Sequence, residues 1–412
     1  MYTVIANFLN GEVFMNKFED KLTSNRVINL PDGHKVRLLG AFDTIVNEAD
    51  GAIRPIRLPY PCFAEFPHRD FDSIRTVVSN CSGTRIEFMT EADSVKLTVR
   101  CTRVDYSEMP GIVNDFVACV NGVVKKEITP SADTAECISR AGSLVSKQIF
   151  RQSSTLEFSG LGKGEKTVTI WLPPALIVDL LGLDAMSPIR ISQESHSPKW
   201  LHYGSSISHC HTVKSPLSVW PVVSATISGY EIMNMGFSGQ CMLDPFVART
   251  IAHSDADVIT ISAGVNIVGA RSMDLRTFPP AVHNFLDIIR ERKPNTPIVL
   301  ISSILWPGSD NIPGPSDMRF NKDGSVTCYS YGDKADIAKG AMTLSASREE
   351  LRQITDERRK TDKNLFYLNG LLLFGSDDVG KFQLLDGLHP TEALYKEIGR
   401  RFSRLVFQGL LA

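Results

Sequence analysis

The sequence contains no long hydrophobic run. No stretch of its 412 residues approaches the roughly 20 consecutive apolar residues that a membrane-spanning helix needs. The N-terminal segment MYTVIANFLNGEVFMNKFED also lacks the basic region and the long apolar region of a secretory signal. We therefore expect no membrane partner and a cytoplasmic location.

Neither sign of charge is in excess. The chain has 44 Lys and Arg residues against 46 Asp and Glu residues, a formal net charge of -2, and no basic run of the kind that follows nucleic-acid phosphates. Glycine patterns that cradle phosphates are missing as well, since neither G-x-x-x-x-G-K-S/T nor G-x-G-x-x-G occurs. We expect neither a nucleic-acid partner nor a nucleotide cofactor.

Paired cysteine motifs are also missing. The eight cysteines are scattered without a C-x-x-C motif, so free and mostly buried thiols are the expected state. The segment His209-Cys210-His211, together with Cys241, could suggest zinc, but adjacent side chains diverge on a helix and no second pair of ligands follows. We expect no metal. The cysteines are Cys62, Cys81, Cys101, Cys119, Cys137, Cys210, Cys241 and Cys328.

The length suggests about two domains, and the N-terminal half has the pattern of an all-β domain. Short runs alternate apolar and polar residues with a period of two, and glycine-containing turns separate them at 80–83, 121–122 and 160–164. This spacing predicts an antiparallel β-sandwich or jelly roll over residues 1–195. The strand-like runs lie at 85–88, 94–99, 116–120, 155–158 and 167–171.

From residue 196 to 412 the pattern changes to alternating strands and helices. Apolar runs are each separated by enough chain for a crossover helix, which predicts a three-layer α/β/α domain with a parallel, flavodoxin-like sheet. In such a domain the functional loops lie at the carboxyl ends of the strands. Strands are expected at 200–203, 230–235, 258–262, 298–302 and 365–368, and helices at 279–292, 345–360 and 392–407.

Two short motifs carry the chemistry of this second domain. The first expected strand ends in Gly204-Ser205-Ser206-Ile207, where a glycine allows the sharp turn that projects a hydroxyl from the edge of a sheet. Near the other end of the chain, Asp386 precedes His389 by three residues. A serine hydroxyl becomes a good nucleophile when a histidine accepts its proton and a carboxylate orients that histidine. The two motifs together predict a nucleophilic serine.

The order of the motifs resembles that of the SGNH (GDSL-like) hydrolases. The four blocks are G-S-S-I at 204–207, N-M-G-F-S-G at 234–239, G-V-N at 264–266 and D-G-L-H-P at 386–390, and they span the C-terminal half. Two positions depart from the usual family pattern. Ser205 stands where the family has Asp, and Ile267 follows Asn266 where the family again has Asp.

The resemblance implies a role for each of five residues. Ser206 would be the nucleophile, His389 the general base, and Asp386 the carboxylate that orients the base. Ser206 and Gly239 through their backbone N–H groups, and Asn266 through its side-chain amide, would form the oxyanion hole. Plainer roles stay open: Ser206 as a helix cap beside another reactive serine, Gly239 as a turn glycine, and Asn266 as a strand-end cap.

The resemblance also implies a function, with two alternatives. A serine esterase would remove a short acyl group from an oxygen of a sugar-like or other small polar molecule, through an acyl-enzyme and without metal or organic cofactor. The sugar-like substrate is suggested because some carbohydrate esterases of this family carry a β-domain ahead of the catalytic one. The alternatives are an acyltransferase with an alcohol or amine acceptor, and a non-catalytic carbohydrate-binding or interaction protein. The oligomeric state is not predicted.

Residues 306–340 form a long segment that follows the fourth expected strand of the sheet. It holds the aromatic residues Phe320, Tyr329 and Tyr331, and loops of this length are usually functional. We interpret it as a candidate wall of the substrate site, with an inert surface excursion as the alternative. It contains no extended aliphatic run that could line a tunnel for a long acyl chain, so short acyl groups are expected.

Overall fold

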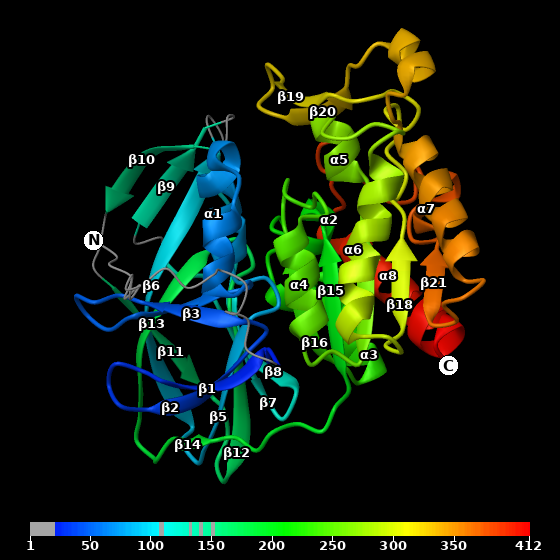
Figure 1. The fold of residues 1–412 in the computed structure, drawn as a ribbon. Helices are drawn as coiled ribbons and strands as arrows, with labels where there is room; N and C mark the ends of the chain where they lie inside the picture. The colour runs from blue at the N-terminus through cyan, green and yellow to red at the C-terminus, as the bar shows by residue number, and fades with distance from the viewer. Residues whose placement is uncertain (1–20, 107–110, 132–133, 140–142, 150–152) are drawn as a thin grey trace, which may run out of the picture. The chain divides into compact units, whose positions relative to one another are not determined.

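The computed structural model describes residues 21–106, 111–131, 134–139, 143–149 and 153–412 (Figure 1). The chain divides into two compact units. Unit 1 extends to His196 and also contains two short later segments, Lys214–Leu217 and His253–Asp255, while unit 2 contains the rest. Backbone hydrogen bonds hold these segments in unit 1, because Asp115 N–H donates to the carbonyl of Lys214 at 2.9 Å and Leu22 N–H donates to that of His253 at 2.8 Å.

In the described part of the chain, unit 1 contains two seven-stranded sheets and one α-helix, α1 (Phe71–Ser79), which packs against β4 and β13. The first sheet has the order β1 (Asn25–Asn29), β2 (Lys35–Leu39), β5 (Arg85–Thr90), β12 (Lys166–Trp171), β7 (Phe116–Val120) and β8 (Val123–Ile128), with β14 (Arg190–Ile191) paired to β5. The second has the order β10 (Leu144–Ile149), β9 (Thr134–Ile138), β6 (Ser94–Tyr106), β13 (Ile177–Ala185), β4 (Ile53–Ile56) and β3 (Asp43–Val46), with β11 (Ser154–Ser159) paired to β6.

The core of unit 1 lies between these two sheets. Buried side chains of β5 and β12, such as Phe88 and Val168, belong to the same cluster as Leu97 of β6 and Val178 of β13. Strand β12 shows why these sequences form such a layer, because its buried and half-buried positions alternate along the whole strand. The predicted all-β sandwich is confirmed. Strands β1 to β4, β8 to β10, β13 and β14, and helix α1, were not predicted.

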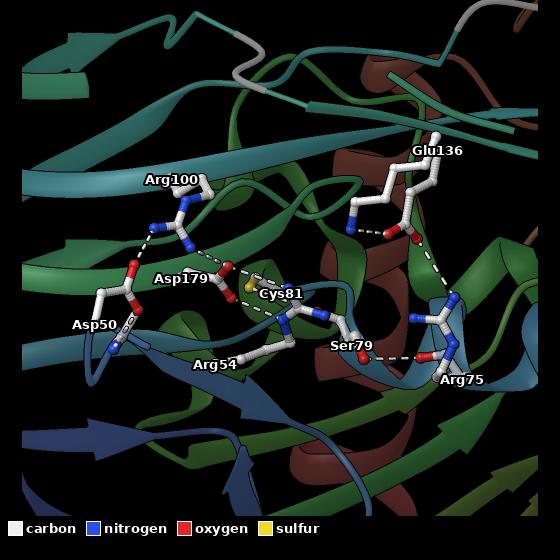
Figure 2. A network of polar contacts seen from close by, with 10 residues as sticks. Asp50, Arg54, Arg75, Ser79, Cys81, Arg100, Glu136 and Asp179 are labelled. Carbon is white, nitrogen blue, oxygen red and sulfur yellow. Dashed lines mark hydrogen bonds and ion pairs between the residues drawn. The ribbon is translucent and has the colours of Figure 1, made fainter. Parts of the chain in front are cut away.

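Unit 1 contains two sets of buried charged side chains, each joined by ion pairs, and Figure 2 shows them at close range. Arg54 donates to Asp179 at 2.7 Å, and the two side chains are only 5% and 2% exposed. Arg100 bridges the carboxylates of Asp179 and Asp50. In the other set Glu136 accepts from Lys147 at 2.8 Å and from Arg75 at 3.4 Å. Each charge that is buried in these sets has an opposite partner, as charges removed from water require.

Unit 2 is built on a five-stranded parallel sheet within its described residues. Counted within the unit, the strands follow the order 2-1-3-4-5 of a flavodoxin-like sheet, and the predicted fold is confirmed. The ends of the five expected strands agree with the structure to within one residue. The strands in sheet order are β16 (Glu231–Gly236), β15 (Lys199–Gly204), β17 (Val258–Ser262), β18 (Ile298–Ile301) and β21 (Leu365–Leu368).

Helices cover both faces of this sheet (Figure 1). Neighbouring residues of β15 point to opposite faces: Trp200 stacks on Phe402 of α8 at 5.1 Å, and Tyr203 stacks on Phe285 of α6 at 5.6 Å. No described helix is long and apolar enough to cross a membrane. The longer helices are α3 (Trp220–Ser228), α4 (Pro245–His253), α6 (Phe278–Arg292), α7 (Leu344–Arg358) and α8 (Glu392–Phe402), and a π-helical turn (Ser403–Leu410) follows α8.

The long segment after β18 contains a β-hairpin that the sequence analysis missed. Its strands are β19 (Ser316–Phe320) and β20 (Val326–Ser330), joined by a turn that contains Gly324 at φ +82°. In Figure 1 the hairpin lies beyond the end of the sheet toward which the strand arrows point. The segment is therefore an ordered element at the carboxyl edge of the sheet.

Candidate active site

The first element of the site is the turn between β15 and the short helix α2 (Ser206–His209). Ser205 caps this helix, because its hydroxyl accepts from the N–H of Ile207 at 3.3 Å. Gly204 has to be a glycine, since a Cβ atom there would lie 2.2 Å from the hydroxyl of Ser208. Ser205 therefore takes the capping role that the sequence left open for Ser206, and Ser206 is the first residue of the helix.

A buried histidine engages the other neighbouring serine. His202 Nε2 lies 2.7 Å from Ser208 Oγ, and its Nδ1 lies 2.7 Å from Thr260 Oγ1. Burial lowers the pKa of His202 to about 3, so this imidazole is neutral at physiological pH. The carbonyl of Ser208 accepts from Asn234 Nδ2 at 2.9 Å. These contacts hold α2 on the sheet. They also pair the hydroxyl of Ser208 with His202 and not with His389.

The second element is the loop that carries Asp386 and His389. His389 Nε2 lies 2.8 Å from Ser206 Oγ, and His389 Nδ1 lies 2.7 Å from Asp386 Oδ2. The other carboxylate oxygen, Oδ1, accepts from the backbone N–H groups of Leu388 at 3.0 Å and His389 at 2.8 Å. Gly387, at φ +84°, supplies the left-handed turn that folds the carboxylate back onto the histidine.

The electrostatics of this pair favour an ionised carboxylate. Burial by itself would raise the pKa of Asp386, but hydrogen bonds from the His389 ring and from two backbone N–H groups lower it well below its usual range. Because the carboxylate accepts the Nδ1 proton, Nε2 is left to accept the proton of Ser206. The structure thus brings together a hydroxyl, a base and an orienting carboxylate.

Gly239 and Asn266 lie in the loops after β16 and β17, the two strands that flank β15. Gly239 has φ +72° in the turn after β16, and Asn266 is the second residue of α5 (Val265–Ala270). The backbone N–H of Cys241 donates to Asn266 Oδ1 at 3.1 Å, so the loop of Gly239 holds the side chain of Asn266. With Oδ1 occupied, the NH₂ group of Asn266 is the part of the amide left for a substrate oxygen.

Ile267 stands where the family pattern has Asp, and the structure buries it completely. It therefore cannot supply the polar support of that Asp. The bond from Cys241 N–H to Asn266 supports the loop instead. A second contact reinforces it, because Cys241 Sγ donates to the carbonyl of Ser262 at 3.4 Å.

Unit 2 matches a known protein family. Residues 199–309 match the GDSL-like Lipase/Acylhydrolase family. Unit 2 contains a GDSL-like hydrolase domain. The family match makes the chain an enzyme that acts on ester bonds. No curated protein matches the sequence.

Solved structures share the two-domain fold at low sequence identity. The salicylyl-acyltransferase SsfX3 from a tetracycline biosynthetic pathway is 22% identical with a TM-score of 0.75, and the match covers 94% of this chain and 98% of that one. A putative GDSL-like lipase from Bacteroides ovatus is 16% identical with a TM-score of 0.61, covering 94% and 96%. A family two carbohydrate esterase from Clostridium thermocellum is 16% identical with a TM-score of 0.55, covering 80% and 93%.

Two further residues of the GDSL-like domain contact the loop that carries Asp386 and His389, and the sequence analysis did not place them there. The rings of His211 and His389 meet edge-on with centroids 5.8 Å apart. Burial of its ring, with His389 as a second cause, lowers the pKa of His211 to about 4, so it is a neutral neighbour of the base. Cys328 of the β19–β20 hairpin donates its thiol proton to Asp386 Oδ2 at 3.3 Å. Neither residue belongs to a family block, so no sequence signal marked them.

Proposed function

We propose that the protein is a serine esterase that forms an acyl-enzyme on Ser206 and passes the acyl group to water. The observation that carries this proposal is the continuous chain of contacts from Ser206 Oγ through the ring of His389 to Asp386. Such a chain lets the hydroxyl lose its proton as it attacks, which is the step that an isolated serine performs poorly.

In the first half of the reaction, Ser206 Oγ attacks the carbonyl carbon of the ester while its proton moves to His389 Nε2. The backbone N–H groups of Ser206 and Gly239 and the amide of Asn266 would donate to the oxygen that becomes negative. The bond to the alcohol then breaks, and the Nε2 proton passes to the departing oxygen. Asp386 remains ionised throughout and stabilises the transient imidazolium.

In the second half, a water molecule gives a proton to Nε2 and attacks the acyl carbon. The bond from that carbon to Ser206 Oγ breaks, and the proton returns to the serine. The free acid leaves, and the enzyme is restored. These steps use only groups of this chain and water.

The substrate class is part of the same proposal. We favour a short acyl group on an oxygen of a sugar-like or other small polar molecule. The likeness to the carbohydrate esterase of Clostridium thermocellum, which covers both units, supports this choice. A cytoplasmic location also belongs to the proposal, and eight free cysteines support it.

The second candidate function is acyl transfer to an alcohol or amine. It is favoured by the likeness to a salicylyl-acyltransferase over 94% of this chain, at a TM-score of 0.75. Both candidates use the same acyl-enzyme and differ only in the group that attacks it, so they can be separated by adding acceptors.

The test uses 4-nitrophenyl acetate with rapid mixing and intact-protein mass spectrometry. An acyl-enzyme predicts a burst of nitrophenol and a mass increase of one acetyl group, located on Ser206. A hydrolase releases acetate at the same rate whether or not polyols or amines are added. A transferase instead releases nitrophenol faster with added acceptor and yields acetylated acceptor. Turnover without any acetylated protein, even on rapid quenching, would contradict the proposal.

A further inference from the structure

Cys328 of the β19–β20 hairpin contacts the loop that carries Asp386 and His389. Its backbone N–H donates to the carbonyl of Asp386 at 2.7 Å, and its thiol lies 3.3 Å from Asp386 Oδ2. The same oxygen accepts from His389 Nδ1 at 2.7 Å. Cys328 therefore meets both the main chain and the carboxylate of the residue that orients the base.

The alternation of the hairpin explains why this side chain faces inward. Along β20, Cys328 and Ser330 are buried, whereas Thr327 is exposed and Tyr329 is half-buried. Ser330 is anchored through its N–H to Ser309 Oγ at 3.1 Å. On the opposite strand, Ser316 Oγ donates to the carbonyl of Gly269, in the helix that carries Asn266, at 3.2 Å. Both strands are thus anchored at the open end of the hairpin, two residues from Cys328, and these anchors set the position of the thiol.

The direction of the proton in this contact is clear. Burial, with the nearby charge of Asp386, raises the pKa of the Cys328 thiol well above its usual range, so sulfur keeps its proton. Asp386 is ionised and can only accept. The carboxylate then has two donors on each oxygen: backbone N–H groups on Oδ1, and the His389 ring and the Cys328 thiol on Oδ2.

We propose that Cys328 is a positioning residue of the catalytic site, whose thiol donates to Asp386 Oδ2 and holds the carboxylate in the rotamer that orients His389. The inference rests on the proposed roles of Ser206, His389 and Asp386. It gives one residue of the β19–β20 hairpin a part in the site, because Cys328 supplies a donor to the carboxylate that orients His389.

Three substitutions distinguish a hydrogen-bond donor at position 328 from a side chain that only fills space. They are Cys328→Ser, Cys328→Val and Cys328→Ala. Serine keeps a proton to donate, valine fills the space without one, and alanine does neither. We expect valine and alanine to lower kcat by about fivefold to tenfold, the range of one weak hydrogen bond to a charged group, with little change in KM. Serine should stay within about threefold of the wild type, because it retains the bond.

Two readouts distinguish this role from simple packing. Without the thiol proton the carboxylate keeps more of its negative charge and holds the imidazolium more tightly, so the acid limb of kcat/KM should move to higher pH in the valine and alanine variants. The far-downfield proton resonance of the His–Asp hydrogen bond should shift in the same two variants. Both readouts should be close to wild type in the serine variant.

Met318→Ala is the matched control, because Met318 is the direct cross-strand neighbour of Cys328 in the hairpin. It removes packing beside Cys328 but leaves the thiol itself in place, so the pH profile and the downfield resonance should stay as in the wild type. A valine variant with wild-type kcat and pH profile would overturn the proposal. So would a serine variant as impaired as valine, since packing alone would then explain the loss.

The remaining alternative is that the thiol acts through a metal. Ligand atoms of Cys328, Asp386 and His389 lie within 4.8 Å of one another, but the thiol and ring protons already account for this closeness. We expect a chelator to leave wild-type activity unchanged. If chelation reproduced the effect of Cys328→Val, the positioning role would be wrong. The proposed function fails separately, if Ser206 forms no acyl-enzyme in the wild type.

Discussion

Ser206 Oγ lies 2.8 Å from His389 Nε2, although 183 positions of sequence separate the two residues. The first follows strand β15 and the second precedes helix α8, so the parallel sheet brings them to one edge. The distance fits direct proton transfer from hydroxyl to imidazole. The predictions below follow from this contact and from the groups that support it.

Removing either partner of this contact should abolish most catalysis. We expect Ser206→Ala and His389→Ala each to lower kcat for an activated ester by at least roughly two to three orders of magnitude. Steady-state assays with 4-nitrophenyl acetate measure the loss, and circular dichroism checks that the fold is kept. A folded Ser206→Ala protein with wild-type turnover would show that another residue is the nucleophile.

Asn266→Ala should act on the transition state. The amide of Asn266 would meet a negative oxygen that exists only during the reaction, so kcat should fall by roughly 10²-fold while KM changes little. Comparison of kcat and KM for the variant and the wild type tests this. A rise in KM with unchanged kcat would make Asn266 a group that binds the ground state.

The pH profile should have one acid limb. Activity requires a neutral imidazole, so kcat/KM should rise with pH along a single limb as His389 loses its proton. Asp386 adds no limb there, because its pKa lies well below its usual range. Its depressed pKa favours the folded state above the value of an unfolded Asp, about 3.9, and that contribution is lost as pH falls toward the folded value. A flat profile between about pH 5 and 8, with chemistry limiting, would count against the histidine base.

The enzyme should prefer esters with a short acyl chain. In a series of 4-nitrophenyl esters, kcat/KM should be highest from acetyl to butyryl and fall toward octanoyl. The physical reason is that a long chain gains about 0.8 kcal/mol per CH₂ only where a buried apolar tunnel receives it. A maximum at decanoyl or longer would show that such a tunnel exists, and it would move the substrate class to lipids.

Stability of unit 1 should depend on its buried ion pair. Asp179→Ala leaves the buried guanidinium of Arg54 without this partner, and we expect a loss of about 3 to 5 kcal/mol in the free energy of unfolding. Glu165→Ala is the control, because Glu165 and its partner Arg190 are both about half exposed, and its loss should cost less than about 1 kcal/mol. Urea denaturation of the three proteins compares them. Equal losses in the two variants would contradict the account.

Much of unit 2 could be predicted from the sequence, because each strand is a short apolar run between polar loops. The runs at 200–203 and 258–262 correspond to β15 and β17. The family order of the motifs also predicted which loops meet at the edge of the sheet. Distances and donors could not be predicted this way, since they depend on turns such as the one at Gly387.

Other features were beyond the sequence analysis for physical reasons. Only two of the ten residues in β19 and β20 are buried, so the apolar alternation that marks a half-buried strand is weak in their sequence. Cys328 lies 58 positions from Asp386, and a single inward-facing thiol leaves no local pattern. His211 was considered only as a zinc ligand, because its contact with His389 depends on how α2 is placed on the sheet.

Labelling of the nucleophile tests the central claim most directly. The protein is incubated with a fluorophosphonate, its intact mass is measured, and the modified peptide is sequenced by tandem mass spectrometry. A serine activated by His389 predicts one adduct per chain, located on Ser206, and no adduct within the same time in folded His389→Ala protein. An adduct on Ser205 or Ser208, or equally fast labelling of the His389→Ala variant, would contradict the account.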